Sequence, residues 1–280
     1  WNESFANKQM SAISLWQNGA KVQDVDTTAT RLDGLKSNNK YTLKATYNNL
    51  QNQDETIAIE FITYAKAVPA VEIANVQSTQ TAISFELNVT DTDNVGAITK
   101  IELLHGNDEP IVAENTARSF ENLLSDNDYT IQVTYVYDLN DGVGERQIVK
   151  TASITTKAKA IPSATISNLS STQSTIECDV AYTDVDSVGS VVEIALYRLE
   201  NKIKSVPFAT HVSFDGLESG KEYKVVVTYK YDLNDGKSEQ TATANAKYST
   251  LIDSIVVDSL ILLNNNVVKL GEELNLRVYF

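Results

Sequence analysis

Apolar and polar side chains alternate along much of the chain. In the run from Tyr129 to Tyr137, every second residue is tyrosine, isoleucine or valine, and the run from Tyr223 to Tyr231 repeats this pattern. An alternation with period two, made of β-branched and aromatic residues, predicts half-buried antiparallel strands. No long stretch has the 3.6-residue period of an amphipathic helix. The pattern therefore predicts an all-β protein.

One sequence pattern occurs three times. The segments are LDGLKSNNKYTLKATY from Leu32, FENLLSDNDYTIQVTY from Phe120 and FDGLESGKEYKVVVTY from Phe214. The loop sequences TDTDNVG and TDVDSVG, from Thr90 and Thr183, also correspond, and YDLNDG occurs twice, from Tyr137 and Tyr231. So many matches in one order indicate tandem repeats.

The repeats divide the chain into four parts. These are a partial first repeat at 1–66, a second at 67–159, a third at 160–247, and residues 248–280, which begin a fourth module or cap the third. The alignment of the first repeat begins near Ser11, with no counterpart of the strand that starts at STQTAI (Ser78) or STQSTI (Ser171), nor of the TDxD loop, and it has NNLQNQ in place of DLNDG. The junctions AKAVPA and AKAIPS are short, and their prolines suit the start of a strand. Short junctions predict an elongated monomeric rod within a longer chain, which a globular scattering envelope would contradict.

The motif L-x-S-x-x-x-Y, seen from Leu217 to Tyr223, resembles the corner between strands E and F of fibronectin type III domains. The resemblance covers residues 67–247 and, in part, 11–66. It implies tandem fibronectin type III-like or immunoglobulin-like β-sandwich modules in a linear array. The second-strand sequences TAISFELNV and STIECDVAY lack the tryptophan usual in the family, which leaves an immunoglobulin-like relative open. The resemblance also implies that Tyr41, Tyr129 and Tyr223 are structural corner residues.

The formal net charge of −14 argues against two classes of partner. Nucleic acids and anionic membranes both attract Lys-rich and Arg-rich surfaces. No apolar run of roughly 18 residues occurs, so direct membrane insertion is not expected. Cys178 is the single cysteine, which fits a cytosolic protein or a bacterial extracellular one. The doubled loops resemble repeats of large bacterial surface proteins, so we expect an extracellular, surface or secreted location.

Residues with catalytic chemistry do not recur in the repeats. His105 and His211 occupy non-equivalent positions, whereas a catalytic or zinc pair needs converging ligands. We interpret both as loop residues near strand ends. Cys178 lies in an apolar alternation, which predicts a buried, inert thiol. Trp16 is expected to be a packing residue. We therefore predict that the chain is not an enzyme and requires no cofactor.

The acidic loops are the exception, because oxygen-rich clusters beside a glycine suit Ca²⁺. Neither loop matches an EF-hand, and Asp, Asn and Gly are also ordinary turn formers. The loops between strands B and C and between strands F and G emerge at one end of such a sandwich, so we expect their carboxylates to gather there. The alternative is that backbone N–H groups and water satisfy them. The candidate calcium ligands are Asp91, Asp93, Asp138, Asn140 and Asp141 in the second repeat, and Asp184, Asp186, Asp232, Asn234 and Asp235 in the third.

Two functions fit these observations. The first is a non-catalytic structural or interaction segment of a larger bacterial cell-surface or secreted protein, used for spacing, display or adhesion, with an unknown protein or glycan ligand. The alternative is a carbohydrate-binding accessory array of a secreted polysaccharide-degrading enzyme. That alternative needs an exposed aromatic platform, and no aromatic candidate recurs in the repeats. Loss of polysaccharide binding on substitution of Trp16 or Trp1 would support it.

Overall fold

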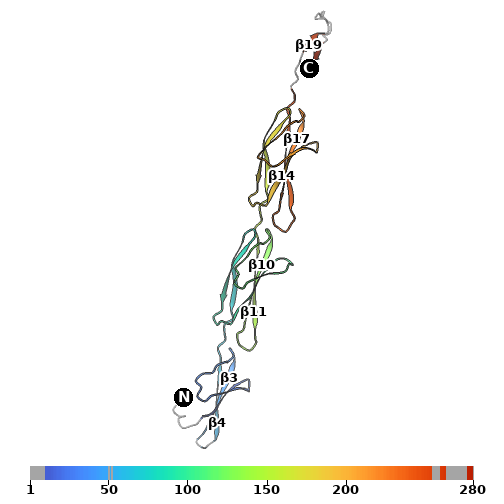
Figure 1. Cartoon of the computed structure of the whole chain (residues 1–280). Coiled ribbons are helices and arrows are strands. Elements are labelled where there is room, and N and C mark those ends of the chain that lie inside the picture. Colours follow the sequence, from blue (N-terminus) through green and yellow to red (C-terminus); the bar gives the residue numbers. More distant parts are fainter. Residues whose placement is uncertain (1–9, 50, 52, 254–258, 263–275, 280) are drawn as a thin grey trace, which may run out of the picture. The chain divides into compact units, whose positions relative to one another are not determined.

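The computed structural model describes residues 10–49, 51, 53–253, 259–262 and 276–279 (Figure 1). The described residues form strands, turns and loops without a helix, so the predicted all-β class is confirmed. Within these ranges no helix is long and apolar enough to cross a membrane. The chain divides into two compact units, residues 1–157 and 158–280, each considered by itself below.

The second repeat is a sandwich of two antiparallel sheets. One sheet has the strand order β5-β6-β9, and the other has the order β11-β10-β7-β8. In the second sheet, β10 pairs with both β7 and β11, and Val133 lies opposite Ile101. The strands are β5 (Ala70–Ser78), β6 (Ile83–Thr90), β7 (Gly96–Leu104), β8 (Ile111–Ala113), β9 (Ser119–Phe120), β10 (Asp128–Tyr137) and β11 (Arg146–Thr155).

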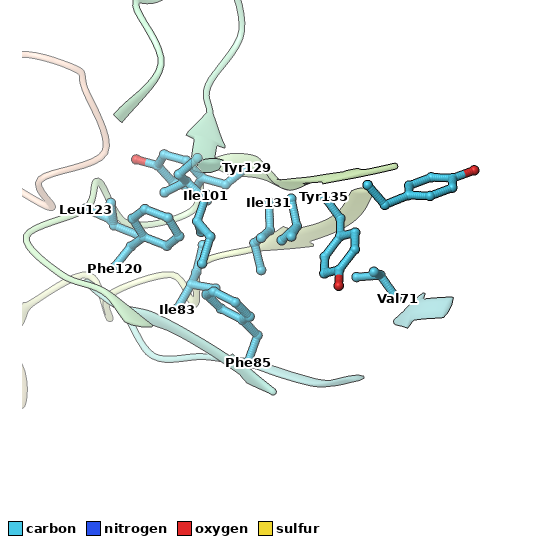
Figure 2. Packing of buried hydrophobic residues seen from close by; sticks show 12 residues of the cluster. Val71, Ile83, Phe85, Ile101, Phe120, Leu123, Tyr129, Ile131 and Tyr135 are labelled. Atoms are coloured by element: carbon cyan, nitrogen blue, oxygen red, sulfur yellow. The ribbon is translucent and has the colours of Figure 1, made fainter. Parts of the chain in front are cut away.

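The core of this module fills the space between its two sheets. Ile83 and Phe85 from β6 lie opposite Ile101 and Ile131 from β7 and β10 (Figure 2). Ile83, Ile101 and Ile131 are completely buried. Because side chains alternate along a strand, the core takes every second residue. Each such side chain contributes roughly 1.5–3 kcal/mol relative to full exposure.

The third repeat has the same arrangement. Its sheets have the orders β12-β13-β16 and β15-β14-β17-β18, and Ile176, Phe214 and Val227 lie in its buried core. The predicted tandem of β-sandwich modules is therefore confirmed. The strands are β12 (Ser163–Ser171), β13 (Ile176–Thr183), β14 (Gly189–Arg198), β15 (Asn201–Val206), β16 (His211–Phe214), β17 (Glu222–Tyr231) and β18 (Gln240–Ser249).

The first repeat is built differently. Its described strands form a single sheet with the order β2-β1-β3-β4. This order corresponds to the sheet β8-β7-β10-β11 of the second repeat, and within residues 10–62, apart from 50 and 52, no second sheet faces it. The strands are β1 (Met10–Gln17), β2 (Ala20–Val25), β3 (Lys40–Asn48) and β4 (Asp54–Ile62).

The last described strands are β19 (Ser259–Leu262) and β20 (Leu276–Tyr279), which pair with each other in a two-stranded antiparallel sheet. The strands predicted from Val267 to Phe280 coincide with described residues only at β20. The rest of that prediction lies outside the described residues.

The three tyrosine corners share one geometry. In each repeat, the tyrosine hydroxyl accepts a 3.0 Å hydrogen bond from the backbone N–H of the residue five positions earlier. A threonine after the last strand donates its hydroxyl to the carbonyl of that same earlier residue. Each corner is thus held at both the N–H and the carbonyl of one residue. The tyrosine, earlier residue and threonine are Tyr41, Lys36 and Thr63; Tyr129, Leu124 and Thr156; and Tyr223, Glu218 and Thr250.

Candidate functional site

The B–C loop, which joins the second and third strands of a complete repeat, is organised around its first aspartate. The Asp91 carboxylate accepts hydrogen bonds from the backbone N–H of Val95 at 2.8 Å and of Gly96 at 3.0 Å. It also accepts a bond of 2.7 Å from the Tyr135 hydroxyl. In the third repeat, Asp184 accepts equivalent bonds from the N–H groups of Val188 and Gly189. The first aspartate of each loop therefore closes a turn.

These hydrogen bonds shift the titration of both partners in the second repeat. Desolvation alone would raise the pKa of Asp91, but the bonds from Val95, Tyr135 and Gly96 outweigh it, and the pKa lies below its ordinary value. Burial, followed by the bond to Asp91, raises the pKa of Tyr135 to about 12. Asp91 is thus held ionised and Tyr135 is held protonated at neutral pH.

The glycine that ends each B–C loop has no space for a side chain. A Cβ at Gly96 would lie 2.6 Å from the Cβ of Tyr137 and would also collide with the carbonyl oxygen of Val136. A Cβ at Gly189 would meet Tyr231 in the same way. The glycine of TDxDxVG is therefore required by the close approach of the neighbouring strand.

The second aspartate of each B–C loop binds the segment that precedes its own module. Asp93 accepts a 2.6 Å hydrogen bond from the N–H of Ala67. Asp186 accepts a bond of the same length from the N–H of Ala160. Ala67 and Ala160 occupy the same place in AKAVPA and AKAIPS, so each module fixes its own incoming linker.

The F–G loop, which follows Tyr137 or Tyr231, also satisfies its carboxylates locally. In the second repeat, Asp138 accepts the N–H of Asn140 at 2.7 Å, and Asp141 accepts the N–H of Val143 at 3.0 Å and the Arg146 guanidinium at 2.6 Å. The bond from Arg146, followed by that from Val143, lowers the pKa of Asp141. In the third repeat, Asp232 accepts the N–H of Asn234. Asp235 accepts both the N–H and the side-chain ammonium of Lys237.

The B–C and F–G loops of each complete repeat are in contact, since the N–H of Asp138 donates to the carbonyl of Val95 and the N–H of Asp232 donates to the carbonyl of Val188. Among the residues that the structure describes, no three His, Cys, Asp or Glu side chains gather closely enough to hold a metal ion. Each carboxylate accepts hydrogen bonds within its own loop or from the preceding linker, as in the alternative that backbone N–H groups satisfy these side chains. Calcium binding stays a prediction without this geometric support. The candidate ligands with such local hydrogen bonds are Asp91, Asp93, Asp138, Asn140 and Asp141, and Asp184, Asp186, Asp232, Asn234 and Asp235.

The F–G loop of the second module contacts the corner of the first module, and both lie in the same compact unit. The backbone N–H of Ser37 donates to the carbonyl of Asn140 at 2.8 Å. The Ser37 hydroxyl donates to the carbonyl of Leu139 at 2.5 Å. Ser37 is only 8% exposed, so its hydroxyl and N–H depend on these acceptors.

Two side-chain amides complete this contact. The amide of Asn39 donates to the carbonyl of Asp141 at 2.9 Å, and the amide of Asn140 donates to the carbonyl of Leu35 at 3.3 Å. We call the four bonds between residues 35–39 and 139–141 the first joint. Sequence reasoning missed Ser37 and Asn39, because both lie in or beside the corner motif and were explained by it.

The strand orders decide the fold. Each complete repeat places its first, second and fifth strands in one sheet, and its third, fourth, sixth and seventh strands in the other. The tyrosine corner lies immediately before the sixth strand. The two complete repeats thus have a fibronectin type III-like β-sandwich fold. Their second strands carry Phe85 and Cys178 at buried positions and contain no tryptophan.

Comparisons with known proteins add little to this assignment. No protein-family model matches the chain, and no curated protein matches it. A crystal structure of chicken CNTN1 FN1-FN3 domains is 9% identical, with a TM-score of 0.24, over 87% of this chain and 89% of that one. A two fibronectin type-III domain segment from chicken tenascin is 13% identical, with a TM-score of 0.25, over 64% of this chain and 98% of that one. The assignment therefore depends on the strand orders.

The remaining candidates have local partners within the two complete modules. His105 lies on the ring of the corner Tyr129, with ring centroids 4.8 Å apart, and His211 pairs with Asp179 at 2.7 Å. The two histidines lie in different modules. Cys178 is buried, and burial followed by the charge of Asp179 raises the pKa of its thiol to about 11. The thiol is therefore protonated and inaccessible at neutral pH.

Proposed function

We propose that this chain is a non-catalytic structural and interaction segment that spaces or displays other domains of a larger bacterial cell-surface or secreted protein, or contributes to its adhesion. The observation that carries the proposal is the first joint. Three of its hydrogen bonds use backbone carbonyls of the second module and have donors on the corner of the first module. The fourth runs from the side-chain amide of Asn140 in the second module to the carbonyl of Leu35 in the first. A spacer needs joints of this kind, because a free linker would let its modules bend.

The hydrogen bonds of the joint favour the docked arrangement of the two modules. A hydrogen bond between protein groups contributes about 1 kcal/mol net, and more when an unpaired group would be left buried. Asp93 adds a bond to the linker through the N–H of Ala67. Together these contacts oppose bending at residues 63–69, the segment between β4 and β5.

Nuclear magnetic resonance relaxation of the full chain tests the proposal. If the first joint restrains the modules, backbone amides of residues 10–62 and of residues 70–155 have one common rotational correlation time. Separate correlation times for the two sets would contradict the role of the joint in spacing.

The expectation of an extended array stays a prediction of the sequence. Small-angle scattering tests it, since a compact globule of 280 residues has a radius of gyration of roughly 19 Å. A measured value near that figure would contradict an elongated spacer.

The carbohydrate-binding alternative receives no specific support. The indole N–H of Trp16 donates to Ser14, and the Lys44 ammonium lies 3.8 Å from the centre of the Trp16 ring. One face of the ring is therefore covered by a cation and is not free to stack on a sugar. Trp1 lies outside the described residues. Binding to a glycan array that is lost in Trp16→Ala would revive this alternative.

A further inference from the structure

One edge strand of the third module lacks the usual protection against pairing with another chain. Proteins guard exposed edges with short strands, bulges or charges. Among the described edges, β8, β9, β16, β19 and β20 have four residues or fewer. Register shifts interrupt the pairing of β2, β5, β12 and β15. β4 carries Asp54, Glu55 and Glu60. β11 carries Arg146 and Lys150. The exception is β18.

β18 is long, regular and nearly uncharged. It pairs with β17 over its 10 residues without a register shift. Residues 240–246, QTATANA, contain no charged side chain and no proline. β11 occupies the corresponding place in the second module, where Lys150 lies opposite Val133 as Ala244 lies opposite Val227. The third module therefore lacks the lysine that guards the edge of the second.

The ladder with β17 fixes which backbone groups of β18 face outward. The N–H of Thr250 donates to the carbonyl of Lys221 at 3.0 Å and so faces β17. Because these groups alternate in direction along a strand, the N–H and C=O groups of Thr241, Thr243 and Asn245 face away from β17. The described part of the chain has no strand on that side. These groups therefore form an open ladder edge.

The described neighbours of β18 contact its end and not this stretch. The N–H of Leu251 donates to the carbonyl of Thr172, just after β12, at 2.9 Å. The chain then follows the E–F corner as far as Asp253, whose carboxylate accepts the Ser219 hydroxyl at 2.8 Å. Both contacts lie beyond residues 240–246, which stay available for pairing.

The sequence along this edge is complementary to itself. If two copies pair in antiparallel orientation with Thr243 opposite Thr243, then Thr241 lies opposite Asn245. The same register places Glu239 opposite Lys247 at both ends of the pairing. Threonine pairs and opposite charges directly across a ladder are stabilising. No like charges meet between them.

Glu239 and Lys247 can reach a second copy. Glu239 pairs with Lys230 at 2.7 Å, and Lys247 pairs with Glu222 at 2.9 Å. The side chains of Glu239 and Lys247 are 54% and 63% exposed. Because exposed ion pairs of this kind contribute little, neither side chain is tied to its present partner.

We propose that β18 pairs with β18 of a second copy of this chain, antiparallel and about a two-fold axis at Thr243. The pairing joins the four-stranded sheets of two third modules into one continuous sheet. The contact uses the same surface on both copies, so it is isologous and stops at a dimer. Main-chain hydrogen bonds supply the affinity, and the pairs of Glu239 with Lys247 set the register. Association between copies goes beyond the proposed function and differs from the monomer that the sequence predicted.

The contact is small, so the association is weak. The stretch 239–247 is roughly 30 Å long, and pairing along one strand edge falls below the roughly 800 Å² per partner of stable complexes. We expect a dimer whose fraction increases with concentration and is measurable by sedimentation velocity of the full chain.

A proline at the axis tests the pairing. Thr243→Pro removes the N–H that both copies use there, and this N–H faces away from β17, so the ladder within the module keeps its bonds. The association constant should fall by roughly tenfold or more. Val149→Pro is the matched control, since Val149 lies opposite Thr134 on β11 as Thr243 lies opposite Thr228 on β18. The control should associate like the unsubstituted chain.

Charge reversal tests the register. Glu239→Lys and Lys247→Glu each place like charges opposite each other at both ends of the pairing. Each single variant should lower the association constant by roughly tenfold. The two substitutions together should restore it, because opposite charges face each other again.

Three results would overturn the proposal. One is a chain that stays monomeric at all accessible concentrations. Another is self-association that Thr243→Pro leaves unchanged, or that Val149→Pro weakens to the same extent. The third is a double charge reversal that associates no better than either single variant. None of these results bears on the first joint, whose restraint is measured by relaxation at concentrations where the chain is monomeric.

Discussion

The side-chain amide of Asn39 donates a 2.9 Å hydrogen bond to the backbone carbonyl of Asp141. The carboxylate of Asp141 takes no part in this bond, because it is occupied by Arg146 and by the N–H of Val143. The first module therefore recognises the backbone of the F–G loop, and the acidic side chains fix the shape of that backbone.

Replacing Ser37 and Asn39 together by alanine should release the first joint. Each loses a side-chain bond to the second module, with a cost of about 0.5–1.5 kcal/mol per bond. The two modules should then tumble with separate correlation times in relaxation measurements. Ser11→Ala is the matched control, since its hydroxyl donates to Thr46 inside the first module. Unchanged correlation times in the double variant would contradict the joint.

Gly96→Ala should destabilise the second module by about 2–4 kcal/mol in chemical denaturation, because the new methyl group collides with β10. Gly106→Ala provides the contrast. Gly106 has a φ of 51° and open space around it, so alanine there should cost only about 1–2 kcal/mol from backbone strain. Equal losses of unfolding free energy in Gly96→Ala and Gly106→Ala would mean that the close approach of β10 does not add to the effect at Gly96.

The pair of Asp91 and Tyr135 should make the stability of the second module depend on pH at both extremes. The folded-state pKa of Tyr135 is raised from 10.0 to about 12, so its contribution is full below pH 10 and is lost as the pH rises towards 12. The pKa of Asp91 is lowered from 3.8, so its contribution is present above that value and is lost as the pH falls through the folded-state pKa. Denaturation midpoints of Tyr135→Phe should fall less between pH 10 and 12 than those of the unsubstituted chain. A parallel fall in both proteins would argue against this pair.

The melting temperature of the chain should be the same in millimolar Ca²⁺ as in the presence of a chelator. The carboxylates of the B–C and F–G loops already accept hydrogen bonds, and no three of them gather among the described residues. Thermal melts and calorimetry check this expectation. A rise in melting temperature that disappears in Asp91→Asn with Asp138→Asn would restore the calcium site predicted from the sequence.

The strands and corners could be predicted from the sequence. The particular N–H group that each carboxylate of the acidic loops binds could not. Alternation fixes which side chains of β10 and β17 enter a core, and the spacing from Leu217 to Tyr223 belongs to one local turn. Both are short-range properties. The hydrogen-bond partner of a carboxylate depends on which N–H group lies nearest in space. For Asp93 this is the N–H of Ala67, which is far from it along the chain. The partner of Ser37 is more distant still, since it lies in another module.

The first repeat was expected to be partial, because it lacks counterparts of the STQ strand and the TDxD loop. The alternation in β3 and β4 matches that of a covered sheet, because sequence pattern shows which face is apolar and not what lies on it. The strand order agrees with that expectation, since the described strands of residues 10–62 form one layer of four.

The bond between Asp93 and the N–H of Ala67 bears on how such arrays can be duplicated and recombined. The donor lies before the first strand and the acceptor lies after the second, and the same arrangement recurs with Ala160 and Asp186. A genetic exchange with its breakpoint at Pro69 or Pro162 would join one module's linker to another module's loop. The bond would survive even so, because the donor is a backbone N–H that any residue except proline supplies. Modules of this type are therefore interchangeable at their linkers as long as each brings its own aspartate.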